Sequence, residues 1–167
     1  MSGSSLCPSR TALLSDIRQA AAGARTVEAL QQTVVGVLSR ALAHYSWTGF
    51  YMVDSSDPET LILGPFLGAQ TPHLRIPLTQ GICGAAVASG QTIIVDDVSA
   101  DPRYLSCSID TKSEIVVPIY AHGKVIGEID IDSHDPAAFT GEDKILLEEI
   151  AQIIGMYVEE HDSPPIP

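Results

Sequence analysis

Positive charge and long apolar runs are both scarce in this sequence. Its 167 residues contain 9 Lys and Arg against 21 Asp and Glu, which gives a net charge of −12. No cluster of basic residues offsets this charge, so the chain repels phosphate backbones and anionic lipid surfaces. The apolar runs, such as residues 115–119, stop well short of the ~20 residues that span a bilayer. We therefore expect no nucleic acid and no membrane among its partners.

Cysteine is also scarce, and the first ten residues carry no secretory signal. That segment has neither a basic start nor an apolar middle, which predicts a cytoplasmic protein with reduced thiols. The three cysteines, Cys7, Cys83 and Cys107, include no C-x-x-C pair. The spacing of Cys83 and Cys107 matches no zinc-ligand pattern, so no metal is expected.

The length and composition fit one folded domain. Hydrophobic residues make up 45% of the chain, and a domain of this size buries roughly two-thirds of the surface that its unfolded chain exposes. We place the domain at residues 10–160, between a flexible N-terminal tail (1–9) and a Pro-rich C-terminal tail (161–167).

Two hydrophobic periodicities divide the domain into helices and strands. Helical spacing predicts helices over 11–22, 26–45 and 142–160, with Thr26 as the N-cap of the second. Period-two patterns and turn residues predict strands over 47–54, 60–68, 92–98, 114–121 and 125–133, with an extended piece at 74–78. A short helix over 81–90 and a long loop over 99–113 complete the order. This order predicts an α+β fold with a mostly antiparallel central sheet of about six strands. We expect the N- and C-terminal helices on one face, and a ligand pocket covered by loops on the other.

Three carboxylates alternate along the strand predicted at 125–133. Glu128, Asp130 and Asp132 therefore share one face. Taken alone, this strand is best interpreted as a solvated outer strand. A second possibility is that the acids line a concavity. The neighbouring strand 114–121 allows this, because Glu114 could lie on the same side of the sheet as the three carboxylates.

Aromatic residues strengthen that second possibility. Trp47 and Tyr51 share one face of the strand predicted at 47–54. If this face meets the acidic ones, two rings and several carboxylates line one concavity, which suits an ammonium or zwitterionic ligand. The sequence leaves open which faces coincide.

The cysteines differ in their predicted surroundings. Cys7 lies in the tail and is expected to be incidental. Cys83 is either a small buried hydrophobe or a thiol whose pKa is lowered at a helix start. Cys107 lies in the long loop, where a cysteine with no packing role is the better candidate nucleophile.

Several motifs together resemble the free methionine-R-sulfoxide reductases, a family built on the GAF domain. They are WTGFY, LGPF, RIP-L-x-x-GICG, a cysteine followed by KSEIVVPI, G-x-IDIDS and F-T-x-E-D. The resemblance covers about residues 25 to 160. It implies a single GAF domain that reduces free L-methionine-R-sulfoxide, needs no metal or organic cofactor, and is recycled by thioredoxin or a similar dithiol.

The resemblance also implies roles for the cysteines. Cys107 matches the cysteine that attacks the sulfoxide sulfur and becomes a sulfenic acid. Many members carry a further cysteine just before the RIP segment, and His73 holds that place here. The resolving role, formation of a disulfide with the nucleophile, therefore falls to Cys83 or to an external thiol.

The remaining site residues follow from the same motifs. Glu114, Asp130 and Asp132 match the acids that bind the polar groups of the substrate, and Glu114 is the expected proton donor to the sulfoxide oxygen. The aromatic pair would enclose the methyl end.

A different class of function is a non-catalytic GAF sensor that binds a small ligand in the same cavity, and a third is a thiol peroxidase-like scavenger.

The sequence leaves the oligomeric state open; the N-terminal helices could form a homodimer.

Overall fold

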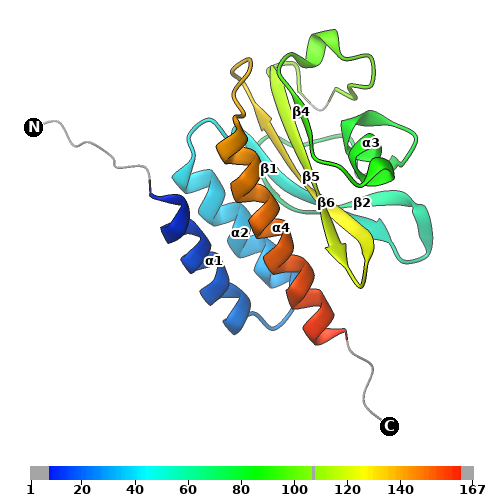
Figure 1. The fold of residues 1–167 in the computed structure, drawn as a ribbon. Helices are drawn as coiled ribbons and strands as arrows, with labels where there is room; N and C mark the ends of the chain where they lie inside the picture. The colour runs from blue at the N-terminus through cyan, green and yellow to red at the C-terminus, as the bar shows by residue number, and fades with distance from the viewer. Residues whose placement is uncertain (1–7, 107, 163–167) are drawn as a thin grey trace, which may run out of the picture.

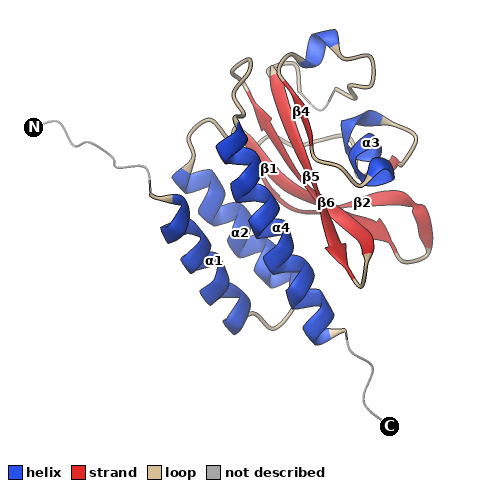
Figure 2. Cartoon of the chain, viewed as in Figure 1, coloured by secondary structure: helices blue, strands red, loops and turns tan. Residues whose placement is uncertain are grey.

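The computed structural model describes residues 8–106 and 108–162 (Figure 1). Four α-helices and six strands form the domain (Figure 2). In chain order the elements are α1 (Arg10–Gly23), α2 (Val27–Ala41), β1 (Trp47–Asp54), β2 (Asp57–Leu67), β3 (Arg75–Pro77), α3 (Gly81–Ser89), β4 (Ile93–Val95), the 3-10 helix η1 (Val98–Ala100), β5 (Ser113–Ala121), β6 (Lys124–Ser133) and α4 (Gly141–His161).

The six strands form one sheet in the order β3-β2-β1-β6-β5-β4, and every neighbouring pair is antiparallel. Helices α1, α2 and α4 cover one face, and α3 lies on the other with the segment that follows β4 (Figure 1). This arrangement confirms the predicted α+β class. Among the described residues, no helix is both long and apolar enough to cross a bilayer.

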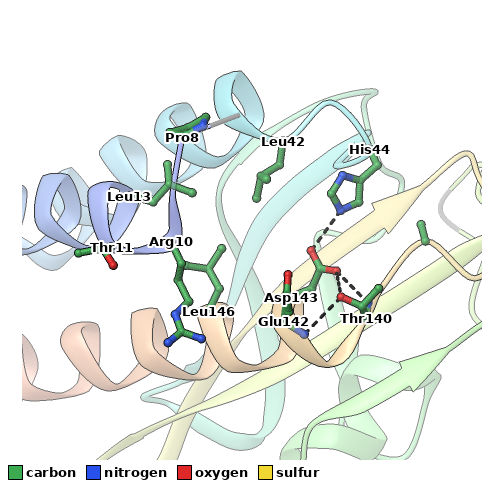
Figure 3. Close-up of a pocket in the computed structure, with 11 residues that line it drawn as sticks. Pro8, Arg10, Thr11, Leu13, Leu42, His44, Thr140, Glu142, Asp143 and Leu146 are labelled. Atoms are coloured by element: carbon green, nitrogen blue, oxygen red, sulfur yellow. Dashed lines mark hydrogen bonds and ion pairs between the residues drawn. The ribbon is translucent and has the colours of Figure 1, made fainter. Parts of the chain in front are cut away.

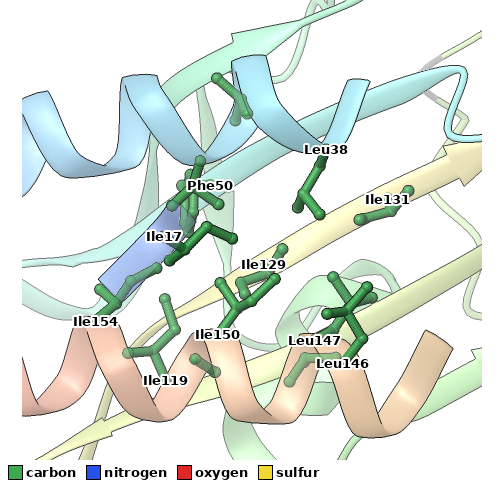
Figure 4. Close-up of a cluster of buried hydrophobic side chains, with 14 of the residues drawn as sticks. Ile17, Leu38, Phe50, Ile119, Ile129, Ile131, Leu146, Leu147, Ile150 and Ile154 are labelled. Carbon is green, nitrogen blue, oxygen red and sulfur yellow. The ribbon is translucent and has the colours of Figure 1, made fainter. Parts of the chain in front are cut away.

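The helical face carries the larger apolar core. Phe50, Ile129 and Ile131 from the central strands are fully buried and pack with α4 residues such as Leu147 and Ile150 (Figure 4). Each fully buried Leu, Ile or Phe side chain contributes about 1.5–3 kcal/mol. Because side chains alternate along a strand, this core fixes which residues of β1, β5 and β6 face the other side.

Local signals set several of the element boundaries. The Thr26 side chain accepts a hydrogen bond from the Ala29 amide at 3.1 Å, as predicted for the N-cap of α2. The β5–β6 hairpin turns at His122 and Gly123, which have φ values of 51° and 73°. Positive φ at both positions matches the twist of the paired strands.

Two predicted elements are shorter by four or more residues in the structure. The second helix ends at Ala41 rather than at residue 45, because Leu42 turns extended and Tyr45 instead donates a hydrogen bond to Asp143 in α4 at 2.8 Å. The strand predicted over 92–98 is confined to Ile93–Val95. Asp97 ends it by accepting hydrogen bonds from Ser99, and such local bonds compete with strand pairing.

Close packing of α4 on β5 requires a glycine. A Cβ at Gly155 would overlap the Tyr120 carbonyl oxygen, whereas a Cβ at Gly141 in the same helix would meet no atom within 4 Å. We expect Gly155→Ala to lower the free energy of unfolding by about 1–3 kcal/mol and Gly141→Ala to leave it unchanged or raise it slightly. Chemical denaturation of both variants is the measurement, and equal stabilities would contradict this packing.

Candidate active site

The acidic and aromatic faces coincide on the side of the sheet opposite α4. Strand β1 lies beside β6, with Trp47 opposite Asp132 and Tyr51 opposite Glu128. Strand β5 lies on the other side of β6, with Glu114 also opposite Asp132. Directly opposed residues in a sheet lie on the same face. The two rings and the carboxylates therefore line one surface, which is the possibility that the sequence left open.

On the aromatic side of this surface, two glycines leave space for the Trp47 ring. Trp47 stacks on Tyr51 and on Phe66, with ring centroids 6.4 and 5.3 Å apart. A Cβ at either Gly49 or Gly68 would overlap the indole ring, so both glycines make room for it. The indole NH donates to a backbone carbonyl at 3.0 Å, which fixes the ring in place.

Helix α3 covers the acidic side and brings a thiol to it. Gly84 lets the helix approach the chain closely, because a Cβ there would lie 2.7 Å from the Leu78 carbonyl oxygen. One residue earlier, Cys83 Sγ lies 3.5 Å from Asp130 Oδ2 and 3.9 Å from Glu114 Oε1. Cys83 is thus in contact with two of the acids that the sequence singled out.

One of the two predictions for Cys83 is wrong. The thiol is buried, and its pKa is raised well above its usual value by burial and by the charges of Asp130, Glu128 and Glu114. A helix N-terminus lowers a thiol pKa, whereas burial and neighbouring acids raise it, and here the raising effects prevail. Cys83 is therefore a protonated, buried thiol in this structure rather than an activated one.

Four carboxyl groups are almost completely buried here: Glu114, Glu128, Asp130 and Asp132, with exposed fractions of 4%, 0%, 1% and 3%. Burial raises the pKa of each, and the charge of Asp130 raises the other three further. The pKa of Asp130 rises only to about 7, because hydrogen bonds from Cys83 and Glu114 favour its charged form. Near neutral pH, Asp130 is therefore the acid of this cluster that ionises, and burial favours the protonated form of Glu114.

Several oxygens of this cluster have no hydrogen-bond partner among the described residues: Glu114 Oε2, Asp130 Oδ1 and both oxygens of Glu128. The Cys83 thiol lies close to Glu128 and partly offsets the rise in its pKa that burial causes. None of the ion pairs within residues 8–106 and 108–162 includes any of these acids. Buried polar atoms are normally paired, so the cluster is built to receive a donor or a cation.

Glu128 was not among the site residues predicted from the sequence. Its alternation with Asp130 and Asp132 was the available signal, but it did not show that α3 would cover this part of β6. A cavity of about 80 Å³ reaches the other end of the cluster and is lined by Trp47, Thr111 and Asp132, among others. Glu128 therefore lies at the deep end and Asp132 at the open end.

A larger cavity of about 630 Å³ lies on the helical side, between the starts of α1 and α4 (Figure 3). Of the two acids that line it, Glu142 and Asp143, the latter is already engaged, with His44 at 3.1 Å and with Thr140 in the capping box of α4. No cysteine lines it among the described residues. This cavity holds none of the predicted site residues.

Cys107 and Cys7 lie outside the described residues. The chain next to Cys107 is described, and there His73 Nε2 lies 2.9 Å from the Ser106 carbonyl oxygen. The backbone carbonyl of His73 also accepts a hydrogen bond from the Tyr51 hydroxyl at 2.8 Å. His73 thus connects Tyr51, one of the stacked aromatic residues, to the loop that carries Cys107.

Comparison with known proteins matches residues 24–159 to the GAF domain. This chain belongs to the GAF domain family. Within that family it is 44% identical over 110 residues to the free methionine-R-sulfoxide reductase of Saccharomyces cerevisiae. The matched region covers 65% of this chain and 61% of that protein. The Escherichia coli free methionine-R-sulfoxide reductase is 34% identical over 135 residues, or 81% of this chain and 79% of that protein.

The GAF fold also matches solved structures. The X-ray structure of free methionine-R-sulfoxide reductase from Neisseria meningitidis in complex with its substrate superimposes with a TM-score of 0.87 at 34% identity. The match covers 98% of this chain and 97% of that one. The family resemblance predicted from the motifs is confirmed.

The raised carboxyl pKa values predict that stability falls as pH rises from about 5 to about 7, where Asp130 ionises in the folded protein. In this range the folded cluster holds protons that the unfolded chain releases, so each such acid removes stability as pH approaches its folded pKa. We expect Glu128→Gln to make the slope of unfolding free energy against pH shallower by up to about 1 kcal/mol per pH unit.

Thermal or chemical unfolding at several pH values measures this slope. Asp135→Asn is the matched control, because Asp135 is exposed just after β6. Identical slopes for Glu128→Gln and wild type would mean that Glu128 ionises normally in the folded protein.

Proposed function

We propose that this protein reduces free L-methionine-R-sulfoxide to L-methionine with its own thiols and an external dithiol such as thioredoxin. The observation that carries the proposal is the buried acidic cluster facing Trp47 and Tyr51. A small zwitterion with an ammonium group and a methyl sulfoxide matches both halves of this surface. The similarity to the reductases of yeast, Escherichia coli and Neisseria supports the same substrate.

The acids divide two tasks in the proposed binding mode: two of them hold the ammonium group and one protonates the sulfoxide oxygen. Asp130 ionises near neutral pH, and with Asp132 it holds the ammonium group. Glu114 is protonated, so it donates a hydrogen bond to the sulfoxide oxygen and then the proton itself. Trp47 lies beside Asp132 and encloses the methyl end.

The redox step uses Cys107 as nucleophile. Its thiolate attacks the sulfoxide sulfur while Glu114 protonates the oxygen, which passes to the Cys107 sulfur as the sulfenic hydroxyl, and methionine leaves. The Cys83 thiol then displaces that hydroxyl as water, forming a Cys83–Cys107 disulfide. An external dithiol reduces the disulfide and restores both thiols. A reducing cytoplasm supplies such a dithiol.

The first test is turnover by wild type, Cys107→Ser and Cys83→Ser in a thioredoxin-coupled NADPH assay. Substrates are the free R epimer, the free S epimer and a peptide-bound sulfoxide. We expect wild type to turn over the free R epimer alone and Cys107→Ser to be inactive. Cys83→Ser should still release one methionine per protein but recycle slowly with thioredoxin.

A result with no turnover, even with dithiothreitol, would contradict the reductase proposal and favour a ligand-binding GAF module. Turnover that survives in Cys107→Ser would instead move the nucleophile to another thiol.

The second test concerns the ammonium site. Asp130→Asn and Asp132→Asn remove the two carboxyl groups that would carry negative charge against the bound ammonium group, so we expect kcat/KM to fall by roughly 100-fold or more, in line with a charge-assisted contact of about 3 kcal/mol. Asp135→Asn, an exposed neighbour on the same segment, should be unchanged. Unaltered kcat/KM in both cluster variants would exclude their binding role.

A further inference from the structure

We infer that Cys83, Glu114 and Asp130 form a binding site for Zn²⁺ or a similar thiophilic divalent cation, and that a cation bound there inhibits the protein. The inhibitory effect rests on the proposed function, whereas the binding itself does not.

The spacing of the three side chains fits a tetrahedral metal. One ligand atom from each residue lies within 4.8 Å of the other two. A tetrahedral site with Zn–S of about 2.3 Å and Zn–O of about 2.0 Å places sulfur and oxygen about 3.5 Å apart. Cys83 Sγ lies 3.5 Å from Asp130 Oδ2 and 3.9 Å from Glu114 Oε1. Small side-chain movements bring all three atoms onto one ion, with a fourth position left for water.

Unpaired buried oxygens point to a ligand as well. Glu114 Oε2 and Asp130 Oδ1 are buried without a hydrogen-bond partner among the described residues. Glu128 lies beside the Cys83 thiol and adds a third acid next to Glu114 and Asp130. A divalent ion neutralises two negative charges where a substrate ammonium neutralises one, so the cluster favours it electrostatically.

The donor set selects the kind of metal. A thiolate sulfur binds Zn²⁺ and other soft or borderline ions, whereas Mg²⁺ and Ca²⁺ prefer sites of oxygen alone. The sequence pattern could not indicate this site, because its ligands come from α3, β5 and β6. Zinc motifs are recognised by short spacings, and here the sheet brings distant residues together.

Inhibition follows from the identity of the ligands. The ion would occupy the carboxylates assigned to the substrate, and it would hold the sulfur assigned to disulfide formation. Metal binding must also displace the protons of the thiol and of Glu114, so affinity should rise steeply with pH.

The binding test uses a Cys7→Ser, Cys107→Ser protein in which Cys83 is the remaining thiol. Titration with Co²⁺ should produce a near-ultraviolet sulfur-to-cobalt absorption band that saturates at one ion per chain. Added Zn²⁺ should abolish the band. Asp130→Asn in this background should weaken Co²⁺ binding roughly 10-fold or more, and Asp135→Asn should not alter it.

Absence of the sulfur-to-cobalt band in the parent protein would overturn the inference. So would a band that persists after Cys83→Ser, because sulfur ligation would then come from elsewhere. The inhibitory part is tested on wild type: Zn²⁺ should raise the KM for free methionine-R-sulfoxide, and a chelator should restore it. An enzyme that is inactive with chelator present contradicts the proposed function alone, since the cobalt spectrum reports on binding independently.

Discussion

Four carboxyl groups, Glu114, Glu128, Asp130 and Asp132, are buried on one face of the sheet, and the fold has to compensate for the cost of burying them. Ionised acids in a dry interior are strongly destabilising, so protons, hydrogen bonds or a cation must offset them. Contacts among the described residues supply this only in part. Cys83 and Glu114 stabilise the charge on Asp130, and Cys83 favours the charged form of Glu128, whereas Glu114 Oε2 and Asp130 Oδ1 have no hydrogen-bond partner among those residues. Such a surface persists because other parts of the fold hold it in place.

The helical side of the sheet supplies that support. Phe50, Ile129 and Ile131 alternate with site residues on the same strands and pack with α1, α2 and α4. Each central strand therefore has one face that stabilises the fold and one that is kept for chemistry. The close contact at Gly155 fixes α4 against β5, and β5 carries Glu114. A well-packed apolar layer on one face of a sheet allows the fold to retain groups on the other face whose burial is costly.

Much of the fold could be predicted because its signals are local. The alternation of WTGFYMVD predicts β1 at its observed bounds, and Thr26 predicts the start of α2. Local signals could not predict that the acidic and aromatic faces of β1, β5 and β6 coincide, because strand order and register depend on the whole sheet. The sequence left the state of Cys83 open for a related reason: its pKa is raised by burial and by acids from β5 and β6 that meet α3 only in the folded chain. Glu128 resembles a solvated strand residue until α3 covers it.

The raised pKa of Cys83 connects the proposed chemistry to the proposed metal site. The acids that keep this thiol protonated are the groups that attract a cation, and any cation placed among them lowers its pKa. An ammonium group would act on the thiol only through this field, leaving the sulfur free to react with Cys107. A thiophilic metal would use the same field but bind the sulfur itself. The same cluster can thus favour the resolving reaction with one cation and block it with another, and the difference lies in whether the cation forms a bond to sulfur.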